Sequence, residues 1–178
     1  MNRKLWLIVS ILVIALLAGC QSAVAPAPIN ATYDMAGPPI PGEAINFEDT
    51  CLLPIEISWV FAGDVEGIAT FQTQIMHDGL CEPDTQYGDL NEHWVATGIF
   101  EGAVNGHEGT FEFFLVAQLI DLYYTAQLAI EPGSGTGDLT GINGIIKFNE
   151  EPGDEPPWPV TGYYYYDVMS GAPMLQEP

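Results

Sequence analysis

Two carboxylates, Glu101 and Glu112, are the residues best placed for acid–base chemistry. They lie in the two β-rich runs on either side of the pair Asn105-Gly106, so we expect them on neighbouring strands. A pair of carboxylates on either side of one glycosidic bond can hydrolyse it. We therefore take Glu101 and Glu112 as the catalytic candidates. The alternative is that both lie on the solvated face of an antiparallel sheet.

Aromatic side chains form a second group of candidates. The four consecutive tyrosines near the C-terminus alternate faces if they form a strand, so two rings point into the domain and two point out. Rings on an inner wall can bind an apolar or a cationic ligand, and core packing is the alternative. The candidate ligand contacts are Phe100, Phe111, Phe113, Tyr163 and Tyr165.

Metal sites are not expected. His77, His93 and His107 have neither helical nor His-x-His spacing. The acidic segments around 78–92 and 150–155 could offer oxygen ligands to Ca²⁺, but they lack EF-hand spacing, which favours solvated loops.

The glycine cluster at 132–144 does not predict a dinucleotide site. Thr140 stands where the fingerprint has its third glycine, no βαβ unit surrounds the segment, and Asp138 would face the pyrophosphate. The sequence also lacks Gly-x-Ser-x-Gly, so nothing supports a serine nucleophile. We expect no cofactor.

The charge balance limits the ligand further. The chain has 24 Asp and Glu against three Lys and Arg, and Lys147 is the only basic residue among these after Cys20. Nucleic acids and phosphorylated ligands need Lys or Arg contacts, so we exclude both and expect a neutral or cationic ligand. The alternative is that the charge only keeps the protein soluble.

The N-terminus has the pattern of an export signal. A basic pair, Arg3-Lys4, precedes an apolar run over 5–18 that is shorter than a typical membrane span. The tetrad Leu17-Ala18-Gly19-Cys20 resembles the lipobox of bacterial lipoproteins. That resemblance implies a signal peptide over 1–19, lipidation of Cys20 and anchoring to the bacterial cell envelope. An ordinary signal or an uncleaved anchor is the alternative.

Lipidation of Cys20 leaves two cysteines, Cys51 and Cys81. In an oxidising compartment these can form one disulfide, which would stabilise the fold by about 3 kcal/mol. Two buried free thiols are the alternative.

The elements that position these residues are all strands. Residues 20–53 are rich in Ala and Pro and predict a linker. Residues 54–170 predict one β-domain, and 171–178 a C-terminal tail. Strands are expected at 55–61, 67–75, 94–104, 110–118, 122–130, 142–148 and 160–168.

The pair Asn105-Gly106 also predicts a strand register. A two-residue hairpin turn here places Phe100 opposite Phe111, and Gly98 opposite Phe113. Ala96 then lies opposite Leu115. Small residues facing large ones on one face suit the inside of a small barrel.

The segment Gly135-Thr136-Gly137-Asp138-Leu139-Thr140-Gly141-Ile142-Asn143-Gly144 resembles the signature of the bacterial family called domain of unknown function 3224. The motif Asn105-Gly106-His107-Glu108-Gly109-Thr110-Phe111 and the tyrosine strand fit the same layout, and the resemblance covers about 60–168. That family is similar to the allene oxide cyclase and dirigent barrels. The resemblance implies an all-β fold, a closed antiparallel barrel of about eight strands. It transfers no mechanism.

The sequence therefore predicts an anchored, exported binding or accessory barrel for a small apolar or neutral ligand. Two alternatives remain open. One is an enzyme of the cyclase or isomerase kind, acting in the barrel lumen. The other is a structural or partner-binding envelope protein with an exposed aromatic patch.

Overall fold

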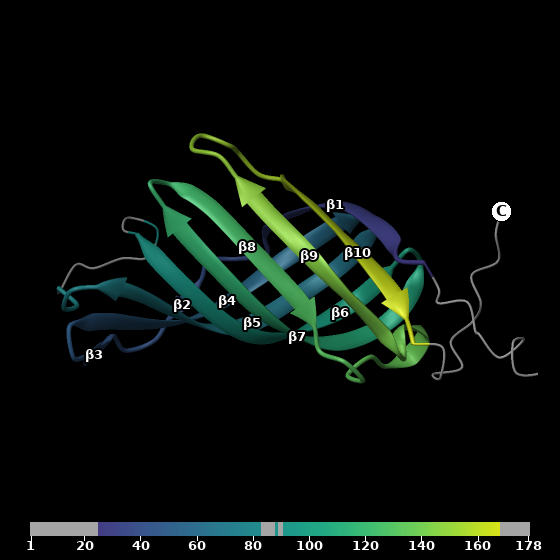
Figure 1. The fold of residues 1–178 in the computed structure, drawn as a ribbon, viewed down its shortest axis with the longest axis horizontal. Coiled ribbons are helices and arrows are strands. Elements are labelled where there is room, and N and C mark those ends of the chain that lie inside the picture. Colours follow the sequence, from purple (N-terminus) through teal and green to yellow (C-terminus); the bar gives the residue numbers. More distant parts are fainter. Residues whose placement is uncertain (1–24, 83–87, 89–90, 168–178) are drawn as a thin grey trace, which may run out of the picture.

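A computed structural model describes residues 25–82, 88 and 91–167, which fold into one antiparallel sheet (Figure 1). The predicted signal peptide, Cys20 and the C-terminal tail lie outside the described residues. The strands are β1 (Ala27–Met35), β2 (Ile40–Pro41), β3 (Ile45–Phe47), β4 (Thr50–Gly63), β5 (Val65–Asp78), β6 (Glu92–Val104), β7 (His107–Ile120), β8 (Tyr123–Ile130), β9 (Ile142–Glu150) and β10 (Trp158–Tyr166), with one short 3₁₀ turn, η1 (Gly137–Leu139).

Eight of the strands close into a barrel. Strands β4 to β10 each pair with the next along the chain, and β1 pairs with β10 on one side and β4 on the other. This closure leaves no open edge in the barrel wall. The predicted all-β fold and closed antiparallel barrel are confirmed.

Strand β1 corrects the predicted domain boundary. Residues expected to belong to a linker instead supply the strand that closes the barrel. Ile29, Ala31 and Tyr33 alternate inward and are almost fully buried, so this segment gains apolar burial as well as backbone hydrogen bonds on both sides. The linker prediction is therefore wrong from Ala27 onward.

A short arm extends beyond the barrel, at the left of Figure 1. Here β4 and β5 continue past the wall, and β2 and β3 pair with β4. A disulfide joins Cys51 to Cys81 with a Cα–Cα distance of 4.8 Å. The Cys81 backbone N–H also donates to the Asn46 side chain at 2.7 Å. These bonds fix the chain after β5 to the outer part of the arm, where β3 pairs with the start of β4.

The β6–β7 hairpin has the predicted register. Asn105 and Gly106 form its turn with φ values of 48° and 79°, the left-handed conformation that this turn type requires. Phe100 pairs with Phe111, Gly98 with Phe113, and Ala96 with Leu115, all on the barrel interior. Glycine at position 98 leaves room for two rings, because a Cβ there would lie 2.4 Å from Phe71 and 2.6 Å from Phe113.

Aromatic rings fill the middle of the barrel. Phe100 and Phe111 stack with centroids 4.7 Å apart, and Trp59 meets Phe71 edge-on at 4.6 Å. Each fully buried side chain of this size contributes about 2 kcal/mol through burial of apolar surface. This core separates the two ends of the barrel.

The glycine-rich segment covers one end, which we call the closed end (right side of Figure 1). The Thr136 backbone N–H donates to the Thr110 carbonyl at 2.9 Å, and η1 turns Leu139 inward until it is fully buried. Gly109 and Gly135 permit this closure, since a Cβ on either would lie 2.0 Å from a backbone oxygen. The glycine-rich segment that carries the family resemblance is therefore a structural cap.

Candidate functional site

The other end of the barrel contains a pocket, which we call the mouth pocket. It lies where β1 and β9 finish and β8 and β10 begin, and its volume is about 300 Å³. That volume is at the lower limit of pockets that hold small organic molecules. Its walls are Tyr33, Met35, Ile57, Trp59, Gly88, Trp94, Leu119, Tyr124, Glu150 and Trp158.

Five aromatic residues dominate these walls. Tyr33 lies 4.8 Å from Trp59 and 5.3 Å from Trp158, measured between ring centroids. Trp94 and Tyr124 form a second pair at 5.4 Å. All five rings come from strands, so the wall is supported by the barrel itself rather than by loops.

Glu150 carries the one carboxyl group among the side chains that line the mouth pocket. It is the last residue of β9, and the alternation of Ile146, Phe148 and Glu150 turns its side chain towards the lumen. Its Oε1 accepts a hydrogen bond from the Tyr33 hydroxyl, across the intervening strand β10. Burial raises the pKa of Glu150; the bond from Tyr33 opposes this rise, and the nearby charge of Asp154 adds to it.

Two tyrosine hydroxyls surround this carboxyl group. Burial raises the pKa of Tyr33 above its ordinary value, and Tyr124 and Glu150 add to the rise. Burial also raises the pKa of Tyr124, with a further contribution from the charge of Glu150. The Tyr124 hydroxyl is buried and has no hydrogen-bond partner among the residues that the structure describes. Buried polar groups are normally paired, so this hydroxyl is available to a ligand.

Glu92 fixes the orientation of the Trp94 ring in the pocket wall. It is fully buried at the start of β6 and accepts a hydrogen bond from the Trp94 indole N–H at 2.8 Å. The Trp158 indole N–H donates to the Asp154 carbonyl at 3.3 Å. The indole donors of Trp94 and Trp158 are therefore already used within the protein.

The proposed catalytic pair does not face this pocket. Glu101 and Glu112 are both exposed on the outer face of the barrel, where Glu101 pairs with Thr110 and Glu112 with Ile99. They occupy the polar positions of strands whose other face is buried. The structure therefore corrects their assignment to lumen chemistry.

The predicted aromatic contacts divide into two groups. Phe100, Phe111 and Phe113 face the interior but pack into the core and do not line the mouth pocket. Tyr163 and Tyr165 lie on the outside, with 36% and 37% of their surface exposed, whereas Tyr164 and Tyr166 are buried. Four consecutive tyrosines do not show which two rings face inward. The prediction of Tyr163 and Tyr165 as the inner pair is wrong.

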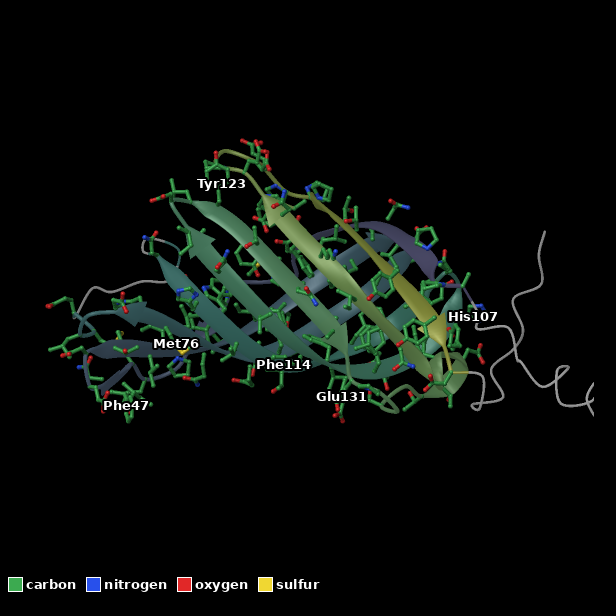
Figure 2. The ribbon with its side chains drawn as sticks, viewed as in Figure 1. Phe47, Met76, His107, Phe114, Tyr123 and Glu131 are labelled. Atoms are coloured by element: carbon green, nitrogen blue, oxygen red, sulfur yellow. A yellow bond between two sulfur atoms is a disulfide. The ribbon has the colours of Figure 1, made fainter. Side chains whose placement is uncertain are left out.

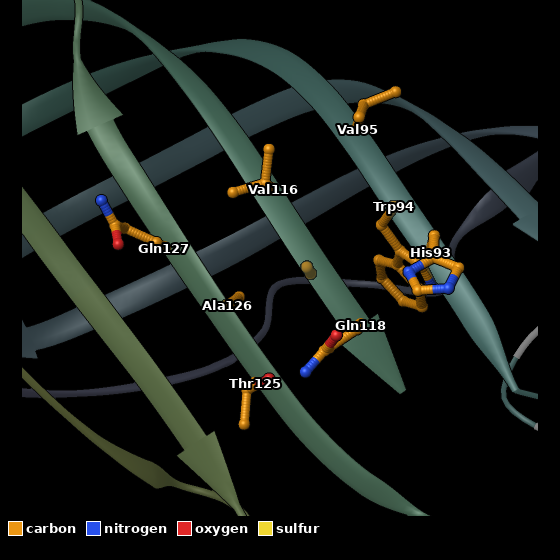
Figure 3. A pocket seen from close by; sticks show the side chains of 9 residues that line it. His93, Trp94, Val95, Val116, Gln118, Thr125, Ala126 and Gln127 are labelled. Carbon is orange, nitrogen blue, oxygen red and sulfur yellow. The ribbon is translucent and has the colours of Figure 1, made fainter. Parts of the chain in front are cut away.

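Two outer depressions are less suited to chemistry. One, of about 460 Å³, lies over β6, β7 and β8, and His93 is the only titratable residue on its wall (Figure 3). The other, of about 400 Å³, contains Tyr163 and Tyr165 together with Phe114, which lies on the outer wall (Figure 2). Neither has a buried carboxyl group.

Two other features are absent from the described ranges. Residues 25–82, 88 and 91–167 contain no group of three or more His, Cys, Asp or Glu side chains arranged to hold a metal ion. Within the same residues, no helix has the length and apolar character needed to cross a membrane.

The mouth pocket could have been suspected from two signals in the sequence. Ile29, Ala31 and Tyr33 alternate within the segment assigned to the linker, and Ile146, Phe148 and Glu150 alternate at the end of an expected strand. Each pattern places its last residue on the inner face. The rings of Trp59, Trp94, Tyr124 and Trp158 gave no such signal, because aromatic residues are equally common in ordinary cores.

Comparisons with known proteins support the fold. A search of curated proteins found no match. A crystal structure of a protein of unknown function from Shewanella oneidensis MR-1, of the DUF3224 family, is similar with a TM-score of 0.63 and 18% sequence identity. The alignment covers 80% of this chain and 99% of that one. At this identity the likeness establishes the shared barrel and nothing about activity.

The family model described as "Protein of unknown function (DUF3224)" matches residues 43–157. The match ends before β10 and begins after β1, so the two strands that complete the barrel lie outside it. It covers well over half of the sequence, and it agrees with the family signature in the glycine-rich segment. The chain therefore belongs to the DUF3224 family of proteins of unknown function.

Proposed function

We propose that this protein is a binding module that holds a small organic ligand in the mouth pocket. The observation that carries the proposal is the convergence of Glu150, Tyr33 and the unpaired Tyr124 hydroxyl on one apolar, aromatic pocket. An apolar wall with a few convergent polar groups is the usual composition of a small-molecule site. Aromatic side chains fill the middle of the barrel, and this supports the mouth as the place where a ligand binds.

The tryptophans provide a direct assay. Three of the four tryptophans, Trp59, Trp94 and Trp158, line the mouth pocket, and the fourth is Trp6 in the predicted signal peptide. Ligand entry should therefore change the tryptophan emission of the processed protein. A change that saturates with ligand concentration would measure affinity at this site.

Native mass spectrometry of the full-length, membrane-extracted protein tests the proposal. We expect an additional mass that denaturation releases, and we expect it to be absent from a Leu119→Trp variant whose pocket is filled. An additional mass that persists in this variant would overturn the proposal. It would also be overturned if the protein carries no ligand and small organic probes leave its tryptophan emission unchanged.

An enzyme of the cyclase or isomerase kind is a second candidate, favoured by one observation. Burial raises the pKa of Glu150 beside two buried tyrosines, which is the setting of a carboxylic acid that can donate a proton. An enzyme would convert many equivalents of a component of a cell extract, and Glu150→Gln would abolish the conversion. A binding module would only deplete the component in proportion to the amount of protein.

We also propose that the protein is exported and anchored to the cell envelope through a lipid on Cys20. The tetrad Leu17-Ala18-Gly19-Cys20 after a basic and apolar leader supports this. Metabolic labelling with an alkyne-bearing fatty acid should mark the wild type and not Cys20→Ser. Equal labelling of both proteins would contradict the proposal.

A further inference from the structure

We propose that the mouth pocket selects an organic cation, with a methylated ammonium group held against its aromatic rings and Glu150 as its counter-ion. This inference rests on the proposed binding function and specifies the chemical class of its ligand. It follows from the charges, the rings and the hydrogen-bonding groups on the pocket wall.

The carboxyl group of Glu150 has no basic residue beside it on the pocket wall. The lining residues include neither Lys, Arg nor His. Lys147, on the same strand, points to the outside and is exposed. The neighbouring side chain with a formal charge is Asp154, which is also acidic. A cation on the ligand would therefore bring the only positive charge to the described part of the pocket wall.

The surrounding rings suit a cation with low hydration. Tyrosine and tryptophan faces attract cations, and the contribution is greatest where water is excluded. Tyr33, Trp59 and Trp94 are each more than nine-tenths buried, so their faces are already partly dehydrated. A methylated ammonium group loses less hydration energy in such a site than a bare ammonium does, because it is larger and has fewer N–H groups for water to bind. Its methyl groups can then contact the rings.

The hydrogen-bonding capacity of the wall argues against a sugar. The indole N–H groups of Trp94 and Trp158 are already bonded within the protein. The Tyr33 hydroxyl is bonded to Glu150, so the polar groups left for a ligand are few: the unpaired Tyr124 hydroxyl, the Glu150 carboxyl group and the indole N–H of Trp59. A ligand with many hydroxyls would lose hydrogen bonds to water here. A cation with one oxygen atom, able to reach Tyr124, fits better.

The charge of Glu150 makes the binding pH-dependent. The groups that face it are Tyr33 from β1, Tyr124 from β8 and Asp154 from the loop after β9. Its carboxyl group holds a proton to higher pH than usual because it is buried. Affinity for a cation should therefore rise with pH as this proton leaves, and a cation in the pocket should lower the pKa of Glu150.

Choline and its uncharged carbon isostere, 3,3-dimethylbutan-1-ol, test the inference on the membrane-extracted protein. The two probes share shape and hydroxyl group and differ in the positive charge. Tryptophan emission should report choline binding about tenfold tighter than the isostere at a pH where Glu150 is ionised. Equal or weaker choline binding would overturn the inference while leaving the binding function intact. Failure of both probes to change the emission would count against both proposals.

Two matched variants locate the charge. Glu150→Gln keeps the shape and the bond to Tyr33, so it should weaken choline binding about tenfold and leave isostere binding unchanged, which also shows that the variant is folded. Glu151→Gln makes the same charge change at the next, exposed residue and should leave choline affinity within about twofold. The rise of affinity with pH should disappear in Glu150→Gln and persist in Glu151→Gln. Choline binding that is unchanged by Glu150→Gln would overturn the role of Glu150.

Discussion

The two ends of the barrel are built from the same eight strands and finish in opposite ways. At the closed end, glycines allow backbone to lie against backbone, and Leu139 and Ile142 are fully buried beneath the cap. At the mouth, large flat rings converge on Glu150 and leave about 300 Å³ between them. Small residues let a barrel end close, whereas rigid rings that cannot interdigitate leave space. The comparison indicates that one end maintains the fold and the other is open to a ligand.

The largest effect should follow a change at Gly109 in the closed end. Gly109→Val would place its Cβ about 2.0 Å from the Thr136 carbonyl oxygen, and neither backbone can move without breaking the strand β7 contacts. We expect loss of the folded barrel, measured by near-ultraviolet circular dichroism. Gly37→Ala is the control, because a Cβ there meets nothing within 4 Å. A native spectrum for Gly109→Val would show that the cap is not needed for closure.

Leu139→Ala should have the next largest effect. Its fully buried side chain closes the end of the core, so its truncation should lower the free energy of unfolding by about 3 kcal/mol in urea titrations. The folded variant should bind probes at the mouth as the wild type does, because Leu139 lies at the opposite end. A loss of binding without a loss of stability would contradict the division between the two ends.

Alkaline pH should destabilise the barrel through tyrosines at both ends. Burial raises the pKa of Tyr33 and Tyr124 at the mouth, and burial, with the charges of Tyr164 and Asp138, raises the pKa of Tyr166 to about 12. The unfolded chain ionises these groups near pH 10. Above that pH the folded state binds more protons, so stability falls as pH rises.

Tyrosinate absorbance, followed together with circular dichroism, measures this effect. We expect three of the eight tyrosines to ionise only at higher pH or together with unfolding. Tyr124→Phe and Tyr166→Phe should each remove one of the late ionisations. Complete ionisation of a still-folded protein near pH 10 would contradict the burial of these hydroxyls.

The smallest effect on stability should come from Glu150. Its pKa is raised in the folded state, so the folded protein binds the extra proton and stability decreases as pH rises above about 4.3 and through the folded pKa. Glu150→Gln should flatten this part of the stability profile, and Glu151→Gln should not. The effect is small because the side chain is only half-buried and the bond from Tyr33 favours the ionised form. An unchanged slope in Glu150→Gln would assign the pH dependence to another group.

The closed end could be predicted from the sequence more fully than the mouth. The Asn105-Gly106 turn determines the register of β6 and β7, since both turn positions need positive φ and the apolar residues then fall on one face. The glycine cluster carries the family resemblance, which implies the closed barrel. Short-range sequence patterns of this kind are sufficient to predict the structure where the contacts join residues that are close in sequence.

The mouth depends on contacts between residues distant in sequence. Tyr33 and Glu150 are 117 positions apart, and β1 was not expected because Ala, Pro and Asn in that segment resemble a linker. Glu150 was assigned to a solvated acidic run, although the alternation in β9 points it inward. The alternation gives the inward direction of the side chain. Whether that side chain lies in the core or at the rim depends on where the strands end, and no local pattern specifies those ends.

The early start of β1 leaves only a short connection between Cys20 and the barrel. Only six residues separate Cys20 from Ala27, the first residue of the barrel wall, so a fully extended chain reaches about 25 Å. Because Ala27 pairs with Tyr164 near the end of β10, β1 begins at the closed end. A lipid on Cys20 would thus keep the cap close to the bilayer and leave the mouth facing away from it, towards molecules that diffuse in the aqueous compartment.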